Sequence, residues 1–510
     1  MSRLKADRAK ALVHDRLGLA DDEAFCRLVW AARELQTRGG SAHGQVFVAP
    51  PEARTTDFRT GQYAFPWFLE TLVNELLTTR KPRPRAGRPM RGLDCEAWST
   101  IARLTNRQRQ WEDLEDGLVL NQDNILRAVD RITHQQFHWQ RGDLNLSTYY
   151  RSGRLFGGER AAERLNDLGF SLNALSVMGL AVYAALERAP YVPFTLDLTL
   201  FGVSPAQQAA AMARISLPLA AMRDQARALR GGYRHPAYAP SALRNTPCLR
   251  TRHHGVEAVL TPLPELVLSR TNSGVYYDLI GGGAEIRNEI GKRFEDYAFD
   301  LLSATVASLS FRREYKYRWA KNTIDSPDLV ASRNEALAWV VECKATKMSF
   351  DSKFGLDAMD QAPRGFDEIA KGVYQVWRYF AHTRLGRTQD LKVADDALGV
   401  VLTLDPWVQV SFTVKGGILD RARALAQSKS PEILEEDMRP VAIYPIENLE
   451  NLVLNQPDLV ILDQVQRACR DAPDSGEIQP DLGETAIDRP YPFADDIGRV
   501  LPWWRLARGS

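Results

Sequence analysis

Three residues in two short segments carry the chemistry that this sequence predicts. Asp328 follows Pro327, and Glu342 and Lys344 lie in a second apolar run close behind it. Side chains alternate between the two faces of a strand, so Glu342 and Lys344 project from the same face. Two carboxylates and an amine gathered in this way can share one divalent cation and one water molecule, and such a site hydrolyses phosphodiester bonds.

The pairing of the two strands decides whether these residues converge. A polar run of four residues that ends at Glu335 separates the strands and predicts a hairpin turn. A turn centred near Glu335 sets Asp328 opposite Glu342, whereas a slip of one residue sets it opposite Val341 and turns it to the other face. Only the first register forms a site. Asp325 is an alternative ligand if the first strand begins earlier.

The two acids require a cation, because neighbouring carboxylates repel each other unless a positive charge lies between them. Oxygen ligands favour a hard divalent ion, so we expect Mg²⁺, with Mn²⁺ able to substitute for it. Lys344 would then orient the attacking water or help to deprotonate it. We expect burial and the nearby cation to lower the pKa of this lysine.

Pro327-Asp328 and Glu342-Cys343-Lys344 resemble the signature of the PD-(D/E)xK nuclease superfamily, which includes type II restriction enzymes and the nuclease domains of recombination exonucleases. The resemblance covers residues 285–465. It implies an α/β restriction-endonuclease-like core, in which helices flank a mixed central sheet. It also implies that Asp328, Glu342 and the main-chain carbonyl of Cys343 are metal ligands. The cysteine is a departure, since the family commonly has an apolar residue there.

A helix is predicted upstream of the two strands, where apolar residues recur at helical spacing over residues 284–302. The family usually places a helix at this point, and a glutamate on it often completes the metal shell. The resemblance therefore implies that Glu295 is a further ligand.

A second helix is predicted downstream, over residues 366–383. Its Gln375 and Tyr379 are four residues apart and resemble the QxxxY helix of recombination-exonuclease-type members, which implies that they position Lys344 or a phosphate. The apolar run 398–404 then predicts a strand buried on both faces. The resulting order of helices and strands is similar to that of the nuclease core.

A surface ion pair between Glu342 and Lys344 on an ordinary strand is the alternative to a metal site. The strand is apolar on both faces, through Ala338, Val340, Val341 and Cys343, and charged groups in a buried strand require a strong reason. The flanking sequence therefore favours the nuclease. A non-catalytic scaffold for nucleic acid or protein with a degenerate site stays open, as does the same chemistry on RNA or branched DNA.

Composition limits the class of protein. The chain has 510 residues, more than one domain needs, and its 45% hydrophobic and 25% charged residues are typical of a soluble globular protein. A net charge of +1 excludes a general polybasic DNA coat, so nucleic acid must be bound by local patches such as Lys344, Lys347 and Lys353. Five scattered cysteines without CxxC spacing indicate reduced thiols and a cytoplasmic protein.

Four regions are predicted along the chain. Residues 1–230 form a mainly helical regulatory or recognition region of no recognised family, with a linker near residues 80–92 and a long helix over residues 204–230. Residues 231–284 connect it to the nuclease domain, residues 285–465. Residues 466–510 are an acidic, proline-rich tail that ends in an aromatic packing segment. The most apolar helix, residues 172–186, is too short to span a bilayer, so we expect no membrane partner.

These features together predict a cytoplasmic, Mg²⁺-dependent DNA endonuclease whose helical region controls activity or target choice. The domain plan resembles restriction or anti-phage effectors, an association from which a defence role and a partner protein are expected. Enzymes of this type often act as homodimers to cut both strands, so self-association is also expected. The sequence contains no P-loop, and nucleotide hydrolysis is not expected.

Overall fold

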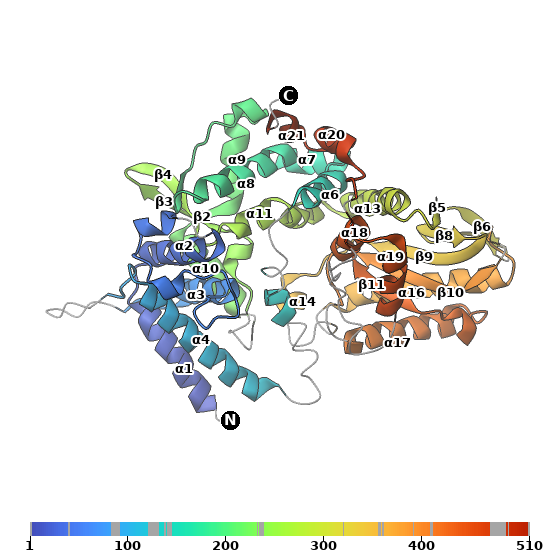
Figure 1. Cartoon of the computed structure of the whole chain (residues 1–510), viewed down its shortest axis with the longest axis horizontal. Helices are drawn as coiled ribbons and strands as arrows, with labels where there is room; N and C mark the ends of the chain where they lie inside the picture. The colour runs from blue at the N-terminus through green and yellow to red at the C-terminus, as the bar shows by residue number, and fades with distance from the viewer. Residues whose placement is uncertain are drawn as a thin grey trace. The chain divides into compact units, whose positions relative to one another are not determined.

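The computed structural model describes residues 3–38, 41–82, 92–120, 132–136, 139, 145–231, 233, 239–319, 321–354, 359, 362–390, 392–408, 412–469, 486–487 and 489–507. The chain divides into two compact units (Figure 1). The first unit comprises Met1–Gln122, Gln135–Gly282 and Leu501–Ser510, and the second comprises Asp123–His134 and Gly283–Val500. Residues 83–91 of the predicted linker and residues 470–485 of the predicted acidic tail lie outside the described residues.

The first unit is mainly helical, which confirms the predicted character of this half of the chain. Its helices are α1 (Arg3–Gly18), α2 (Asp22–Arg38), α3 (Pro66–Thr78), α4 (Trp98–Val119), α6 (Leu146–Phe156), α7 (Glu159–Asp167), α8 (Leu172–Leu186), α9 (Pro205–Ile215), α10 (Leu219–Gly231), α11 (Glu265–Thr271), α12 (Tyr276–Leu279) and α21 (Pro502–Ala507). Helix α3 is at the centre of the core, since it is buried on almost every side. Trp503 of α21 is buried and lies edge-on to Tyr149 of α6, with ring centroids 5.8 Å apart.

The first unit also contains a small sheet that the sequence analysis did not predict. Its strands, in the order β1-β4-β3-β2, are β1 (Tyr191–Pro193), β4 (Val256–Leu260), β3 (Cys248–His253) and β2 (Ser216–Pro218). The predicted long helix over residues 204–230 is wrong, because it is split by β2. Pro218 has no N–H to continue a helix and biases the preceding residue toward an extended conformation. Leu249 and Leu260 enter the core of this unit, so residues 239–282 do more than connect two domains.

The second unit is built on a mixed five-stranded sheet. Its strands, in the order β11-β10-β9-β8-β5, are β11 (Val441–Pro445), β10 (Val393–Thr403), β9 (Ala336–Lys344), β8 (Leu329–Arg333) and β5 (Ser310–Arg313). Strands β9, β10 and β11 are parallel, whereas β8 is antiparallel to both of its neighbours. Strands β6 (Lys316–Trp319) and β7 (Asn322–Asp325) form a separate hairpin between β5 and β8 in the chain.

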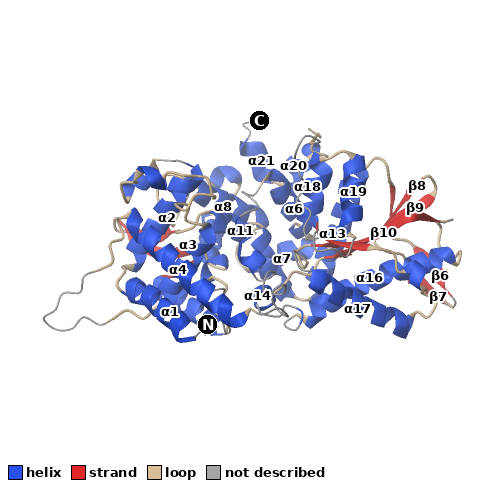
Figure 2. Ribbon diagram, turned by 60° about the horizontal axis from the view of Figure 1, so that its bottom comes forward, coloured by secondary structure: helices blue, strands red, loops and turns tan. Residues whose placement is uncertain are grey.

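Helices pack against this sheet. The helices of the second unit are α13 (Ala284–Thr305), α14 (Phe350–Phe354), α16 (Pro363–Arg384), α17 (Phe412–Lys429), α18 (Ile446–Asn455), α19 (Asp458–Ala468) and α20 (Ile497–Val500). Figure 2 shows α16 and α17 on one side of the strands and α18 and α19 on the other. The apolar face of α16 includes Val373 and Trp377 and shares a core with Val340 and Val401 of the sheet. A mixed sheet flanked by helices therefore follows the predicted helical region.

Within the described part of the chain, no single helix is both long and apolar enough to cross a bilayer. Helices α7 and α8 meet the criterion only when taken together, and they are bent by 64° with respect to each other.

Candidate active site

The hairpin formed by β8 and β9 sets the register of the predicted site. Asn334 and Glu335 have φ angles of 49° and 61° and form a two-residue turn, with Arg333 paired to Ala336. This pairing, continued without change, would set Asp328 opposite Val341. A β-bulge intervenes, and beyond it Leu329 pairs with Val341. The next position along sets Asp328 level with Glu342, which is the register that the site requires.

Asp328 accepts two hydrogen bonds from main-chain N–H groups, one at its carbonyl and one at its carboxylate. It lies directly before β8, and its carbonyl accepts a hydrogen bond from the N–H of Glu314 at 2.9 Å. Its carboxylate Oδ2 accepts a hydrogen bond from the N–H of Cys343 at 2.6 Å. Asp325 ends β7 with an exposed side chain, 3.8 Å from Lys316 Nζ. Of the two acids that the sequence left open, Asp328 is therefore the one beside Glu342 and Lys344.

Glu342 is buried and has a partner on each carboxylate oxygen. Lys344 Nζ donates to its Oε2 at 2.7 Å, and Gln375 Nε2, from α16, donates to its Oε1 at 3.1 Å. The amide oxygen of Gln375 also accepts from Lys344 Nζ at 3.3 Å. The three side chains form a closed triangle that holds the ammonium group in one position.

Burial and mutual repulsion disfavour the charged forms of both acids. The pKa of Asp328 is raised well above its usual value by burial and then by the charge of Glu342, while Lys344 acts in the opposite direction. The pKa of Glu342 is also raised by burial, and Lys344 again opposes the shift. Lys344 forms its ion pair with Glu342, and Asp328 has no ion-pair partner in the described part of the chain.

The side chains of this site raise the pKa of Lys344, whereas its lowering by burial together with a bound cation stays a prediction. Burial does lower this pKa, but the carboxylates of Glu342 and Asp328 outweigh it. The side chains around Lys344 therefore favour its ammonium form, which donates hydrogen bonds and supplies positive charge.

Glu295 lies close enough to influence the two acids electrostatically but has its own partner. Its carboxylate accepts a hydrogen bond from Lys292 Nζ at 2.8 Å, one turn earlier on α13. Its charge contributes to the raised pKa of both Asp328 and Glu342. No group of three His, Cys, Asp or Glu side chains that could hold a metal ion occurs among the residues described. The role of Glu295 as a further ligand stays a prediction.

The donor set nevertheless fits Mg²⁺. This ion is usually bound by one or two carboxylates, with waters and substrate phosphates completing its shell. Asp328 and Glu342 supply two hard oxygen donors, and Asp328 Oδ1 accepts no hydrogen bond from the described part of the chain. The pKa of the Cys343 thiol is raised by burial and by Asp328, so the thiol is neutral, and the predicted third donor is the Cys343 carbonyl.

Tyr379 is not brought to Lys344. Its hydroxyl donates to Asp390 Oδ2 at 2.5 Å and lies 2.7 Å from the hydroxyl of Tyr315. Burial and Asp390 raise its pKa. A buried phenol needs hydrogen-bond partners, and these residues provide them on the side of α16 toward β6. Gln375 alone of the QxxxY pair contacts the site.

Gly372 is a positioning residue that the sequence analysis missed. A Cβ atom at this position of α16 would lie 2.9 Å from Cε of Lys344 and 3.5 Å from a methyl group of Val401. Because Gly372 has no side chain, the side chain of Lys344 has room between α16 and the sheet. A glycine inside a helix, three residues before Gln375, was the available signal.

Arg378 is a second residue near the site that the sequence analysis did not select. It follows Gln375 by three residues on α16, and its charge lowers the pKa of Glu342. Its Nε atom is buried and has no hydrogen-bond partner. A guanidinium group with an unused donor beside a buried acid adds to the positive charge around Glu342.

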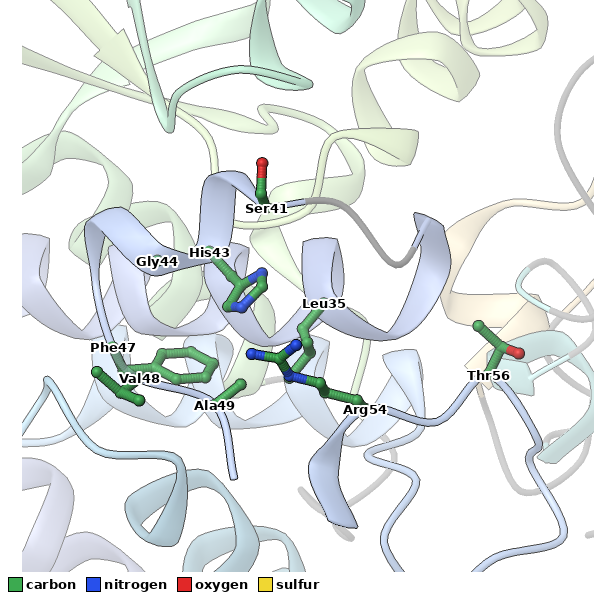
Figure 3. A pocket seen from close by; sticks show the side chains of 9 residues that line it. All are labelled: Leu35, Ser41, His43, Gly44, Phe47, Val48, Ala49, Arg54 and Thr56. Carbon is green, nitrogen blue, oxygen red and sulfur yellow. The ribbon is translucent and has the colours of Figure 1, made fainter. Parts of the chain in front are cut away.

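A cavity of about 430 Å³ lies in the first unit and contains none of the predicted site residues (Figure 3). It is bordered by α2 and the following short turns, and its lining is Leu35, Ser41, His43, Gly44, Phe47, Val48, Ala49, Arg54 and Thr56. This lining has no carboxylate, so the cavity does not offer the acid pair of a hydrolytic metal site.

Comparison of the chain with protein-family models, with curated protein sequences and with solved structures finds no match.

Proposed function

We propose that the second unit is a Mg²⁺-dependent nuclease of the PD-(D/E)xK type that hydrolyses phosphodiester bonds in DNA. One observation carries the proposal: Lys344 Nζ lies 2.7 Å from Glu342 Oε2, and Asp328 is hydrogen-bonded at 2.6 Å to the residue between them. The mixed sheet and the order of its strands support a restriction-endonuclease-like core. A second acid beside Asp328, which has no ion-pair partner in the described part of the chain, supports a divalent cation as cofactor.

Each residue of the candidate site has its own role in the proposed reaction. Asp328, Glu342 and the carbonyl of Cys343 would hold the ion, which supplies Lewis acidity and neutralises charge that grows on the phosphate. Lys344, as an ammonium ion, donates a hydrogen bond to the attacking water or to a phosphate oxygen and stabilises negative charge there. Gln375 orients Lys344 through its amide oxygen, and Glu342 prevents the amine from turning away.

The biological part of the proposal rests on the domain plan. A mainly helical unit joined to such a nuclease resembles effectors of restriction or anti-phage defence, in which the helical part controls when or where the enzyme cuts. A cytoplasmic location, a homodimer that cuts both strands and a partner protein belong to the same proposal.

The test uses the purified full-length protein with supercoiled plasmid, linear duplex DNA, single-stranded DNA and tRNA, each with Mg²⁺, Mn²⁺ or EDTA. We expect DNA cleavage that needs the metal and that is lost in Glu342→Ala and Lys344→Ala proteins which remain folded. Asp420→Ala is the matched control, because it removes an exposed acid on α17 of the same unit and should leave cleavage unchanged. Undiminished cutting by both site variants would refute the assignment.

A non-catalytic scaffold is the second candidate, and one observation favours it. Both oxygens of Glu342 already have partners, so the triangle with Lys344 and Gln375 is satisfied without an ion. A scaffold of this kind would show neither cleavage nor a rise in melting temperature with Mg²⁺ or Mn²⁺, whereas a metal-binding nuclease would show both.

A further inference from the structure

The hairpin β6–β7 has one buried face and one basic face. Lys316 and Arg318 alternate with Tyr317 and Trp319 along β6, and Lys321 follows in the turn. Tyr317 is buried, whereas Lys316, Arg318 and Lys321 are exposed. Because side chains alternate along a strand, Lys316 and Arg318 project from the same outer face.

The inner face is fixed to α16, the helix that carries Gln375. The hydroxyl of Tyr317 lies 2.8 Å from Nδ1 of His382, and the ring of Trp319 stacks on His382 with centroids 4.1 Å apart. Nε2 of His382 is in turn 3.1 Å from Glu432. Figure 2 shows the hairpin next to α16. These contacts leave the basic face outward and hold the hairpin in a defined orientation.

The base of the hairpin is joined directly to the candidate active site. The N–H of Ser326 donates to the carbonyl of Tyr315 at 2.8 Å, and the N–H of Tyr315 donates to Ser326 Oγ at 2.9 Å. One step further, the N–H of Glu314 donates to the carbonyl of Asp328. A molecule that binds along the hairpin is therefore held at a fixed position relative to the carboxylate of Asp328.

The basic side chains of the hairpin have fewer acidic partners than those of the neighbouring strand β5. On β5, Arg312 pairs with Asp390, and Arg313 pairs with Asp296 and Asp300.

On the hairpin, Lys316 has one distant partner, Asp325, at 3.8 Å. Neither Arg318 nor Lys321 has an acidic partner within the described ranges. Two exposed cations without counter-charges on a rigid support are suited to an anionic polymer.

We infer that the β6–β7 hairpin is a DNA-binding ribbon that lies in the major groove of a duplex, with Arg318 and Lys321 on phosphates. This inference rests on the proposed function in taking nucleic acid as the ligand. The major groove of B-form DNA admits a two-stranded β-ribbon, whereas the major groove of A-form RNA is too deep and narrow for side chains to read. The shape of the hairpin therefore favours duplex DNA over duplex RNA.

The test measures DNA binding under conditions in which no metal-dependent cleavage can occur. Fluorescence anisotropy of a labelled DNA duplex is followed in EDTA over a range of KCl concentrations, with the full-length protein and with the Arg318→Ala/Lys321→Ala variant. We expect about tenfold weaker binding of the variant, and a slope of log affinity against log salt that is smaller by about 0.9 for each lost phosphate contact, or about 1.8 for both. Arg423→Ala/Arg467→Ala removes the same charge from exposed, ion-paired positions of the same unit and should bind as the unmodified protein does.

Each outcome decides the inference. Equal duplex binding by the hairpin variant and the unmodified protein would overturn it, even if Mg²⁺-dependent cleavage is found. No duplex binding by the unmodified protein would overturn it as well, and equally tight binding of duplex RNA would overturn the assignment to the DNA groove. If the hairpin variant loses DNA binding while the unmodified protein fails to cleave, the ribbon stands and the proposed nuclease falls.

Discussion

The carboxylate of Asp328 accepts a hydrogen bond of 2.6 Å from the main-chain N–H of Cys343. This bond joins Asp328, directly before β8, to the residue between Glu342 and Lys344 at the end of β9. The side chains of Asp328, Glu342 and Lys344 therefore share a rigid frame of main chain. This frame holds two mutually repelling acids close together, at a cost in stability.

Gly372 offers a test of how closely Lys344 must be positioned. In Gly372→Ala, the new methyl group would overlap Cε of Lys344 and displace the amine. We expect cleavage to fall by about 100-fold, because small displacements of a catalytic group have effects of this size. The fold should persist, since the displaced atom belongs to the end of a flexible side chain.

The matched control for this variant is Gly291→Ala in α13, where a Cβ would meet nothing within 4 Å. It should leave cleavage unchanged and raise the free energy of unfolding by about 0.5–1 kcal/mol, the usual gain from alanine inside a helix. Normal cleavage by Gly372→Ala in the plasmid assay would show that the position of Lys344 is not critical.

Asp328→Asn tests whether function has been obtained at the expense of stability. The substitution removes a charge that repels Glu342 but keeps an oxygen that can accept from Cys343. In EDTA at neutral pH we expect the free energy of unfolding to rise by about 0.5–2 kcal/mol. Added Mg²⁺ should raise the melting temperature of the unmodified protein and not that of the variant.

Asp325→Asn is the comparison for this experiment, because Asp325 is exposed and its substitution should change stability by no more than about 0.5 kcal/mol. A lower melting temperature for Asp328→Asn in EDTA would contradict the repulsion between the two acids.

Tyr379→Phe separates the role that the QxxxY resemblance implies from the role that the contacts indicate. Loss of the hydroxyl removes its hydrogen bonds with Asp390 and Tyr315, so we expect a loss of about 1–3 kcal/mol in the free energy of unfolding. The cleavage rate of the folded variant should stay close to normal. Gln375→Ala should behave in the opposite way, with a marked loss of rate, since Gln375 contacts both Glu342 and Lys344.

The first unit carries a pH-dependent element in Glu112 of α4. Burial raises the pKa of this carboxyl group to about 8, although a hydrogen bond of 2.7 Å from Gln108 opposes the shift. In the unfolded chain the same group ionises near pH 4.5. The unfolded state therefore loses its proton first, and the free energy of unfolding falls between about pH 4.5 and pH 8, by up to about 1.4 kcal/mol per pH unit.

Glu112→Gln should remove this dependence. Denaturant unfolding at pH 5 and pH 8 would measure it, with Glu163→Gln as an exposed control on α7 that should follow the unmodified protein. A loss of stability with rising pH that is the same in all three proteins would exclude Glu112 as its source.

Much of the candidate site follows from local sequence. Glu342 and Lys344 must share a face of β9, because the alternation of side chains is a property of any strand. The helical spacing of α13 and α16 and the apolar run of β10 could likewise be recognised without a structure. Each of these features depends on residues within a few positions of one another, where backbone geometry alone sets the relation.

Tertiary structure decided the relations between distant residues. The turn at Asn334 and Glu335 would by itself bring Asp328 opposite Val341, and the bulge before Trp339 restores the productive register. Tyr379 finds its partner in Asp390, and Gly372 is needed only because Lys344 passes beneath α16. Sequence periodicity states which face a side chain occupies, but strand register, bulges and close approaches depend on packing between segments, and so only the folded chain determines which groups meet.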